Sequence, residues 1–141
     1  MSTVDLSTEF GAHVEKRLET DTLIWLTTVG STGTPYPTLV WFLWTNSELL
    51  IFSQPDKPKL RHLARNQQVA LNFQSNPHGG DVVVMHGVAR APAELPSEEE
   101  RRIYAQKYTE GIKGLGMTYE QLAAEYSVPI RIRLEKLRGW A

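Results

Sequence analysis

The side chains best suited to bind a ligand lie in one basic stretch near the middle of the chain. It contains four cations, namely Lys57, Lys59, Arg61 and Arg65, and no Asp or Glu occurs between Lys57 and Gly80. Residues 49–53 predict a β-strand, and the residues after it predict a short helix with Asp56 as the N-cap. Cations at a helix start oppose the helix dipole by roughly 0.3–1 kcal/mol each, so their placement favours an anion such as a phosphate between them. A solvated, basic helix start is the alternative, and spacing alone does not decide between the two.

Polar groups that could assist the cations lie at the edges of the same stretch. Ser53 and Gln54 end the predicted strand with a hydroxyl and an amide, and His62 adds an imidazole. Pro58 suits the first turn of a helix, because backbone N–H groups there make no intrahelical hydrogen bond and proline has no N–H. We therefore include Ser53, Gln54 and His62 with the cations in the candidate anion site.

Aromatic side chains occupy the apolar strand predicted at residues 36–44. Trp41, Phe42 and Trp44 lie there, next to strand 49–53 if a tight turn joins the two strands. An aromatic surface beside an anion site suits a planar cofactor that carries a phosphate. For any one of these residues a place in the core or in a dimer interface is the more common role.

No protein-borne catalyst is visible in the sequence. The four histidines lack metal-ligand spacing, and there is no nucleophile elbow, phosphate-loop motif or dinucleotide-binding glycine fingerprint. Residues 98–100, three consecutive glutamates, fit the first turn of a helix better than a catalytic carboxylate pair. We therefore expect no catalytic residue and no metal site, and an enzyme of this kind would rely on a cofactor for its chemistry.

Length and composition indicate one globular domain, residues 1–141. Hydrophobic residues make up 41% and charged residues 22% of the chain, and the net charge is −1, which argues against attraction to nucleic acid or to an anionic membrane. The absence of cysteine excludes disulfides and thiolate chemistry and fits a reducing compartment. The N-terminus shows no export signal, and no apolar run approaches the roughly 20 residues of a membrane span, so we expect a cytoplasmic protein.

Hydrophobic periodicity and turn residues predict a mainly β (α+β) domain. A helix is expected over residues 7–20, and six strands over residues 22–29, 36–44, 49–53, 68–74, 81–91 and 130–134. Gly87 marks a bulge, and Ser97 with Glu100 and Thr118 with Gln121 form two capping boxes of a helical excursion that breaks over residues 111–116. The connections are too short for parallel crossovers, so the strands predict a six-stranded antiparallel split β-barrel with short flanking helices.

Several segments resemble the pyridoxamine 5′-phosphate oxidase-like split-barrel superfamily. They are Thr34-Pro-Tyr-Pro-Thr-Leu-Val-Trp-Phe42, Leu50-Ile-Phe-Ser53, Lys59-x-x-His62-Leu63 and Asn66-x-x-Val69. The resemblance extends from Thr22 to the terminal Arg138-Gly-Trp140 and is greatest to the actinobacterial reductases that use the deazaflavin coenzyme F-420. The chain lacks the C-terminal Arg and His motifs of the vitamin B6 oxidases, which disfavours that activity.

The resemblance implies a homodimer with two cofactor sites at the subunit interface. In such proteins the cofactor ring lies near the positions of Thr38, Val40, Trp41, Ser53 and Gln54. The phosphate would meet Lys57 and Lys59, together with Arg61 and His62, although His62 stands where the family often has Asn. The C-terminal end lies close to the partner's site in the family, which adds Trp140 to the candidates.

The function expected from these observations is hydride transfer from reduced F-420 to a small unsaturated or quinone-like molecule. Two alternatives keep the same fold: an FMN-binding oxidoreductase, and a non-catalytic carrier of F-420 or haem. A small barrel that binds single-stranded nucleic acid would use the same cations and aromatics. Near-neutral charge and one confined basic patch disfavour that last alternative.

Overall fold

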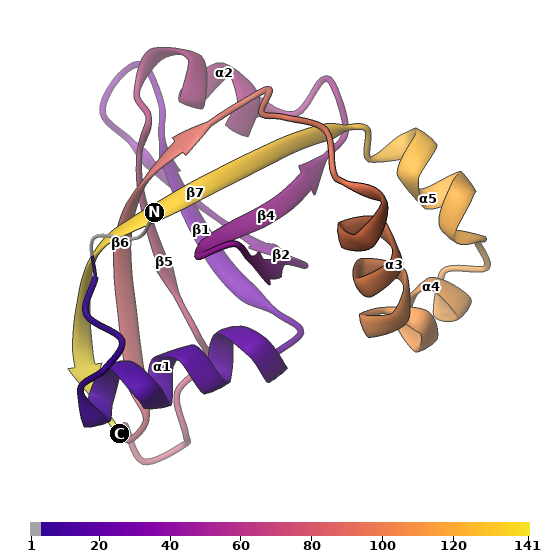
Figure 1. Ribbon diagram of the computed structural model, residues 1–141. Helices are drawn as coiled ribbons and strands as arrows, with labels where there is room; N and C mark the ends of the chain where they lie inside the picture. Colours follow the sequence, from indigo (N-terminus) through magenta and orange to yellow (C-terminus); the bar gives the residue numbers. More distant parts are fainter. Residues whose placement is uncertain (1–3) are drawn as a thin grey trace.

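The strands form one antiparallel sheet that curls into a barrel, shown in the computed structural model of Figure 1, which describes residues 4–141. Residues 1–3, part of the N-terminal segment in which no export signal is visible, lie outside the described residues. The strands are β1 (Ile24–Val29), β2 (Pro35–Val40), β3 (Leu43–Thr45), β4 (Glu48–Ser53), β5 (Gln68–Asn72), β6 (Val82–Arg90) and β7 (Val128–Trp140). The helices are α1 (Glu9–Thr20), α2 (Pro58–Arg65), α3 (Glu98–Lys107), α4 (Thr109–Gly114) and α5 (Tyr119–Glu125).

The strand order explains how the sheet closes. The order is β2-β1-β5-β6-β7-β4-β3, so the two edge strands are β2 and β3. Only Trp41 and Phe42 separate these edges along the chain. A link of two residues can join the two edges of a seven-stranded sheet only if the sheet curls until the edges approach each other. The split-barrel architecture predicted from the sequence is therefore confirmed.

Three of the expected elements differ from those in the structure. The single strand expected over residues 36–44 is two strands, so the sheet has seven strands among the described residues instead of six. The last strand spans Val128–Trp140 and is much longer than the five residues predicted. Residues 111–116 do not simply break the helical excursion, because Thr109–Gly114 forms α4.

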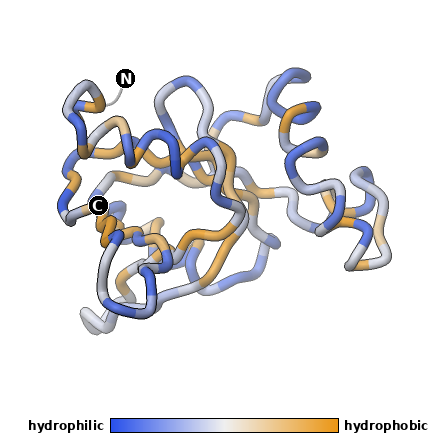
Figure 2. Tube along the Cα trace, turned by 90° about the horizontal axis from the view of Figure 1, so that it is seen from below, coloured by the Kyte–Doolittle hydropathy of each residue, from blue (hydrophilic) through white to orange (hydrophobic). Residues whose placement is uncertain are grey.

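The core fills the interior of the barrel with mainly aliphatic side chains from β1, β4, β5, β6 and β7. Figure 2 shows the hydrophobic residues following the strands, while hydrophilic residues predominate in the turns and on the exposed helices. Ile130, Ile132 and Leu134, predicted to point inward, are fully buried. A second, smaller cluster joins Leu43 and Leu50 of the sheet to Tyr104, Tyr108, Ile112 and Leu122 of the helical excursion.

The helices α3, α4 and α5 form an insertion between two paired strands. β6 and β7 are neighbours, and Arg90 pairs with Arg131, so all three helices lie within the connection between these two residues. In Figure 1 the inserted helices lie together on one side of the barrel, while α1 and α2 lie at opposite ends of it. Both predicted capping boxes are present, at Ser97 with Glu100 and at Thr118 with Gln121.

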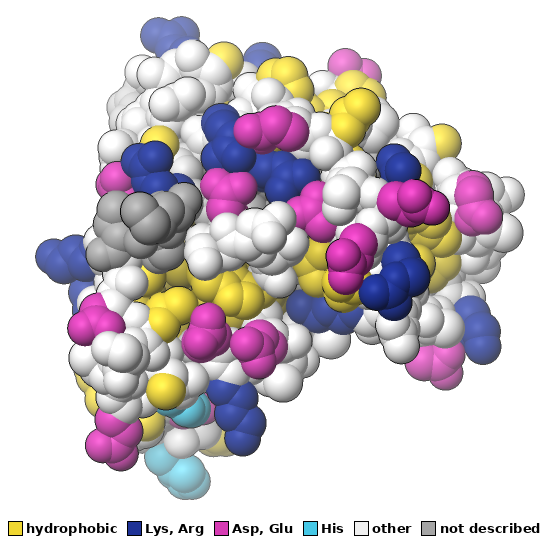
Figure 3. All heavy atoms as spheres, in the orientation of Figure 1, with side chains coloured by type: hydrophobic (Ala, Val, Ile, Leu, Met, Phe, Trp, Pro, Cys, Tyr) yellow, Lys and Arg dark blue, Asp and Glu magenta, His cyan; other side chains and the backbone are white. Residues whose placement is uncertain are grey.

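Charged side chains of both signs are interspersed over the face of the molecule shown in Figure 3, in keeping with a net charge of −1. Exposed hydrophobic side chains lie among them between the barrel and the inserted helices. Among the described residues, no helix is both long and apolar enough to cross a membrane.

The predicted bulge at Gly87 is confirmed by a register shift between His86 and Gly87 in the pairing of β6 with β7. A Cβ atom at this position would lie 2.6 Å from the carbonyl oxygen of Arg133 and 2.9 Å from a methyl carbon of Ile132. The backbones therefore approach each other closely at this point, and only glycine leaves room for the approach.

We expect Gly87→Ala to destabilise the protein by about 1–3 kcal/mol, because overpacking against a neighbouring backbone must be relieved by movement of the sheet. Urea unfolding followed by circular dichroism measures the change. Gly114→Ala is the matched control, because a Cβ atom there would meet no neighbouring residue within 4 Å and the position ends a helix. Equal stability of the two variants would contradict the close approach at Gly87.

Candidate functional site

A cavity of about 630 Å³ lies between the sheet and the inserted helices. This volume is within the range of roughly 300–1,000 Å³ typical of small-molecule sites. On the sheet side it is lined by the end of β2 and by β4 and the turn that follows, including Thr38, Val40, Trp41, Phe52 and Gln54. On the helix side it is lined by α3 and α5, including Arg101, Tyr104, Tyr119, Leu122 and Tyr126.

The start of α2 brings two lysines to this cavity. Pro58 is the first helical residue and Lys57 takes the N-cap position, but no side chain caps the helix. The prediction that Asp56 caps the helix is therefore wrong, and Asp56 is exposed. Because Lys57 has no acceptor oxygen in its side chain and the first turn contains no acidic residue, the α2 start keeps its partial positive charge.

Lys57 and Lys59 both line the cavity and form no ion pair with any described residue. Lys59 is partly buried, whereas Lys57 is exposed. Burial lowers the pKa of Lys59, and the positive charge of Lys57 lowers it further. An anion placed between the two ammonium groups would reverse both effects, because it would compensate lost hydration and screen the repulsion.

The structure places six of the ten predicted site residues in the cavity lining. These are Thr38, Val40, Trp41, Gln54, Lys57 and Lys59. Gln54 is also fixed by the insertion, because its side-chain amide donates a hydrogen bond of 2.7 Å to the Glu125 carboxylate near the end of α5.

The other four predicted residues lie outside the lining of this cavity. The Ser53 side chain is buried and donates a hydrogen bond to the backbone carbonyl of Gln54. Arg61 is exposed on α2. His62 packs against Tyr36, and its Nδ1 lies 2.8 Å from the hydroxyl of Thr28. Trp140 is 58% exposed at the opposite end of β7, where its indole N–H donates to the carbonyl of Gly79.

The two residues that link the sheet edges have different surroundings. Trp41 reaches the cavity and stacks on Tyr108 at 4.4 Å between ring centres, with the rings nearly parallel. Phe42 is fully buried in the barrel core, so it does not offer the ring surface expected from the sequence. The Tyr108 hydroxyl accepts from the Phe42 N–H at 2.9 Å and donates to the Thr22 carbonyl at 2.8 Å. Lys107 donates to the Phe42 carbonyl, and burial lowers the pKa of this lysine to about 8.

Sequence reasoning missed the wall of the cavity that the insertion contributes. Arg101 and Tyr104 of α3 and Tyr108, its C-cap residue, recur every three or four residues, which places them on neighbouring positions of one helix face. This spacing was a usable signal for α3. No local pattern indicated that α5 would turn Tyr119 and Tyr126 toward the same space.

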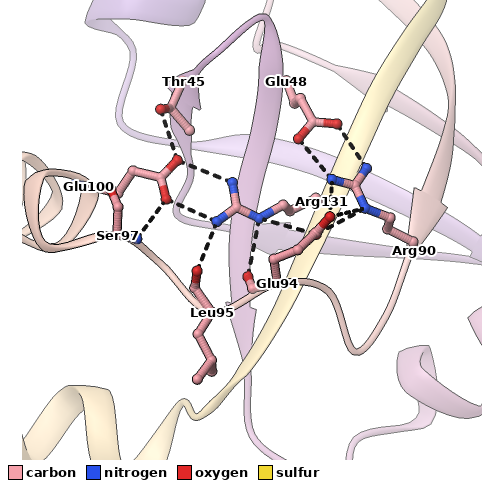
Figure 4. Close-up of polar contacts among 8 residues, drawn as sticks. All are labelled: Thr45, Glu48, Arg90, Glu94, Leu95, Ser97, Glu100 and Arg131. Atoms are coloured by element: carbon pink, nitrogen blue, oxygen red, sulfur yellow. Dashed lines mark hydrogen bonds and ion pairs between the residues drawn. The ribbon is translucent and has the colours of Figure 1, made fainter. Parts of the chain in front are cut away.

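A network of ion pairs holds the insertion where it joins the barrel (Figure 4). The Arg131 guanidinium binds both carboxylate oxygens of Glu100, at 2.9 and 3.1 Å, and both side chains are almost completely buried. Glu100 also accepts from the Thr45 hydroxyl and from the Ser97 N–H. Arg90 joins Glu94 to Glu48 of β4. The network therefore fixes the first turn of α3, and with it one wall of the cavity, to the sheet.

The comparisons with known proteins agree with this architecture. The family model described as pyridoxamine 5′-phosphate oxidase matches residues 10–141, and the chain belongs to this family. No curated protein matches the chain. Among the described residues, no group of three or more His, Asp or Glu is arranged to hold a metal ion.

Solved structures that match the chain share its fold. A conserved hypothetical protein from Mycobacterium tuberculosis is 17% identical with a TM-score of 0.68, covering 99% of this chain and 88% of its own. HutZ, the heme storage protein from Vibrio cholerae, is 16% identical with a TM-score of 0.63, and the match covers 91% of this chain and 92% of HutZ. An F420 reductase is 18% identical with a TM-score of 0.62, and the match covers 88% of this chain and 94% of the reductase. At these identities the likeness shows the fold.

We expect Glu100→Gln to destabilise the protein by about 3 kcal/mol, because it leaves the buried Arg131 cation without its charged partner. Chemical denaturation at neutral pH measures the loss. Glu99→Gln is the control, since Glu99 is 73% exposed and pairs with Arg102 only at 3.6 Å. A loss for Glu100→Gln no greater than that of the control would contradict the role of the network.

The stability of the wild type relative to Glu100→Gln should also depend on pH. Hydrogen bonds from Arg131, helped by Ser97 and Thr45 and opposed by burial, lower the pKa of Glu100 from 4.5 to about 2. The stabilisation is therefore complete above pH 4.5 and is lost as the pH falls toward 2. The stability difference between wild type and Glu100→Gln should shrink across this interval.

Proposed function

We propose that the chain is an oxidoreductase that binds reduced F-420 and transfers hydride from it to a small unsaturated or quinone-like molecule. The observation that carries this proposal is the partly buried Lys59 ammonium, which lines the cavity beside Lys57 with no carboxylate paired to either lysine among the described residues. A cofactor phosphate is an anion that these two lysines could bind by charge-assisted hydrogen bonds. Solved structures that share this fold include a FAD-binding protein, an F420 reductase and a heme storage protein, so the fold is compatible with the proposal.

The residues around the cavity have distinct roles in this proposal. Lys57 and Lys59 hold the phosphate, and Thr38, Val40 and Trp41 form the surface on which the ring lies. The stacking of Trp41 on Tyr108 fixes the orientation of that surface. F-420, when bound, supplies the hydride, and the helices α3 and α5 limit the access of water to the reacting faces.

FMN is the nearest alternative cofactor, because Lys57 and Lys59 could hold its phosphate and its ring could lie on the same surface of Thr38, Val40 and Trp41. A non-catalytic role in binding F-420 or haem is the other alternative. The described residues that line the cavity include no histidine, so the most common protein ligand of haem iron is missing from this lining. This supports a deazaflavin or flavin over haem.

We also propose that the protein is a cytoplasmic homodimer with the cofactor sites at its interface. The edge strand β2 supports this proposal, because its Tyr36 and Leu39 are 47% and 46% exposed and Leu39 itself lines the cavity. An edge strand with exposed apolar side chains is a natural surface for another chain. In a dimer, Trp140 would be available to the site of the partner.

We expect Lys59→Ala to weaken F-420 binding by about 1.5–3 kcal/mol, the scale of a hydrogen bond to a charged group. Fluorescence titration of the wild type and the variant with F-420 and with FMN, side by side, measures both affinities. Arg65→Ala is the control, because it removes an exposed cation from the last turn of the same helix, outside the cavity lining.

Two outcomes of this titration would count against the proposal. Unchanged F-420 affinity in Lys59→Ala would remove the phosphate from this site. Tighter binding of FMN than of F-420 by the wild type would favour the alternative cofactor. Single-turnover oxidation of bound, reduced F-420 by a quinone then separates an enzyme from a carrier.

We expect sedimentation of the purified protein to give twice the monomer mass, and Leu39→Glu to shift it toward the monomer, because a charge would be buried at the interface. Ile103→Glu is the control, since Ile103 is 37% exposed on α3 and lies outside the cavity lining. A wild-type monomer at micromolar concentration would exclude a stable dimer.

A further inference from the structure

The charged residues that line the cavity are all cationic. Of the described lining residues, Lys57, Lys59 and Arg101 carry charge, and no Asp or Glu is among them. The chain as a whole has 16 acidic and 15 basic residues, so a cavity with cations alone is not a reflection of overall composition. The two lysines belong to the α2 side of the cavity and Arg101 belongs to α3, on the side of the insertion.

Arg101 has no carboxylate partner among the described residues, although three glutamates precede it. Glu100 is bound by Arg131, and Glu99 pairs with Arg102. The positive charge of Arg101 instead acts on the hydroxyl of Tyr119 in the cavity wall. Burial raises the pKa of Tyr119, and the positive charge of Arg101 opposes that rise. Arg101 is therefore a cation that faces the cavity and has no counter-ion of its own.

The wall around this cation is aromatic and aliphatic. Phe52 and Tyr104 meet edge to face, with 5.0 Å between ring centres, and Tyr104 is almost fully buried. Tyr119, Tyr126 and Leu122 complete the wall on α5 and its end. Flat apolar surfaces of this kind favour a planar conjugated molecule, and a guanidinium is suited to a carboxylate because it can donate two parallel hydrogen bonds.

We propose that the insertion side of the cavity binds a planar conjugated carboxylate, with its carboxylate on Arg101 and its conjugated part against Tyr104 and Phe52. This inference rests on the proposed function in two ways: Lys57 and Lys59 are assigned to the cofactor phosphate, and the bound acid is the acceptor of the hydride. It narrows the acceptor from any unsaturated molecule to an anionic one, an aromatic or α,β-unsaturated acid. Arg101 is then the residue that determines specificity for the acid over its neutral analogue.

The test compares 2-naphthoate with methyl 2-naphthoate, which share the ring system and differ in charge. Both are titrated into the cofactor-free protein and followed by ligand fluorescence. Wild type should bind the acid more tightly than the ester. Arg101→Gln should lower affinity for the acid about fivefold to tenfold, on the order of 1 kcal/mol for a partly solvated charge pair, and change affinity for the ester less than twofold. Arg102→Gln, which removes the neighbouring exposed cation, should alter neither.

Three results would overturn the inference. Equal effects of Arg101→Gln on acid and ester would show that the charge of Arg101 does not select the ligand. Loss of naphthoate binding in Lys59→Ala, with none in Arg101→Gln, would place the carboxylate on the lysines. If Arg101→Gln lowered the affinity for F-420 as much as the affinity for 2-naphthoate, Arg101 would be assigned to a carboxylate of the cofactor. Absence of F-420 binding, with naphthoate selectivity intact, would instead refute the proposed function and leave this site standing.

Discussion

The two-residue link between the edges of the sheet is the constraint on which the rest of this structure depends. Trp41 and Phe42 connect β2 to β3, so the sheet must curl into a barrel for the chain to pass from one edge to the other. The same link directs Phe42 into the core and Trp41 into the cavity. Tyr108, from the insertion, holds the backbone of Phe42 by hydrogen bonds and stacks on Trp41. The link that closes the barrel therefore also forms part of the cavity lining.

The cavity draws its chemistry from two places that are far apart in the sequence. The α2 start supplies Lys57 and Lys59, and the insertion supplies Arg101 and the tyrosines. The Arg131–Glu100 pair lies where the insertion leaves the sheet and sets the position of α3. A buried ion pair is not required for stability as such, because apolar side chains can fill the same volume. Its bidentate geometry, however, restricts the orientation of the helix start and so holds the α3 wall of the cavity in place.

Local patterns predicted most of the fold, and six of the ten predicted site residues line the candidate cavity. Alternating apolar residues gave the inward positions of Ile130, Ile132 and Leu134, and capping chemistry gave the starts of α3 and α5, because both depend on short-range geometry. The split at Trp41–Phe42 escaped prediction because a continuous apolar run reads as one strand. His62 lies beside the cations in sequence, yet the helix turns its ring toward Thr28 and Tyr36. The α5 wall depends on how the insertion folds back, a long-range property without a local signature.

The presence of two separate hydrophobic clusters has an evolutionary consequence. The barrel cluster includes residues from α1, α2 and most of the strands, whereas the smaller cluster binds the insertion to the outer side of the sheet. Substitutions within the insertion therefore fall mainly on the smaller cluster and leave the barrel packing intact. Such a division allows the α3 and α5 wall to vary while the start of α2, which carries Lys57 and Lys59, keeps its position on the barrel. A lineage built on this scaffold can change the lining of its cavity without rebuilding its fold.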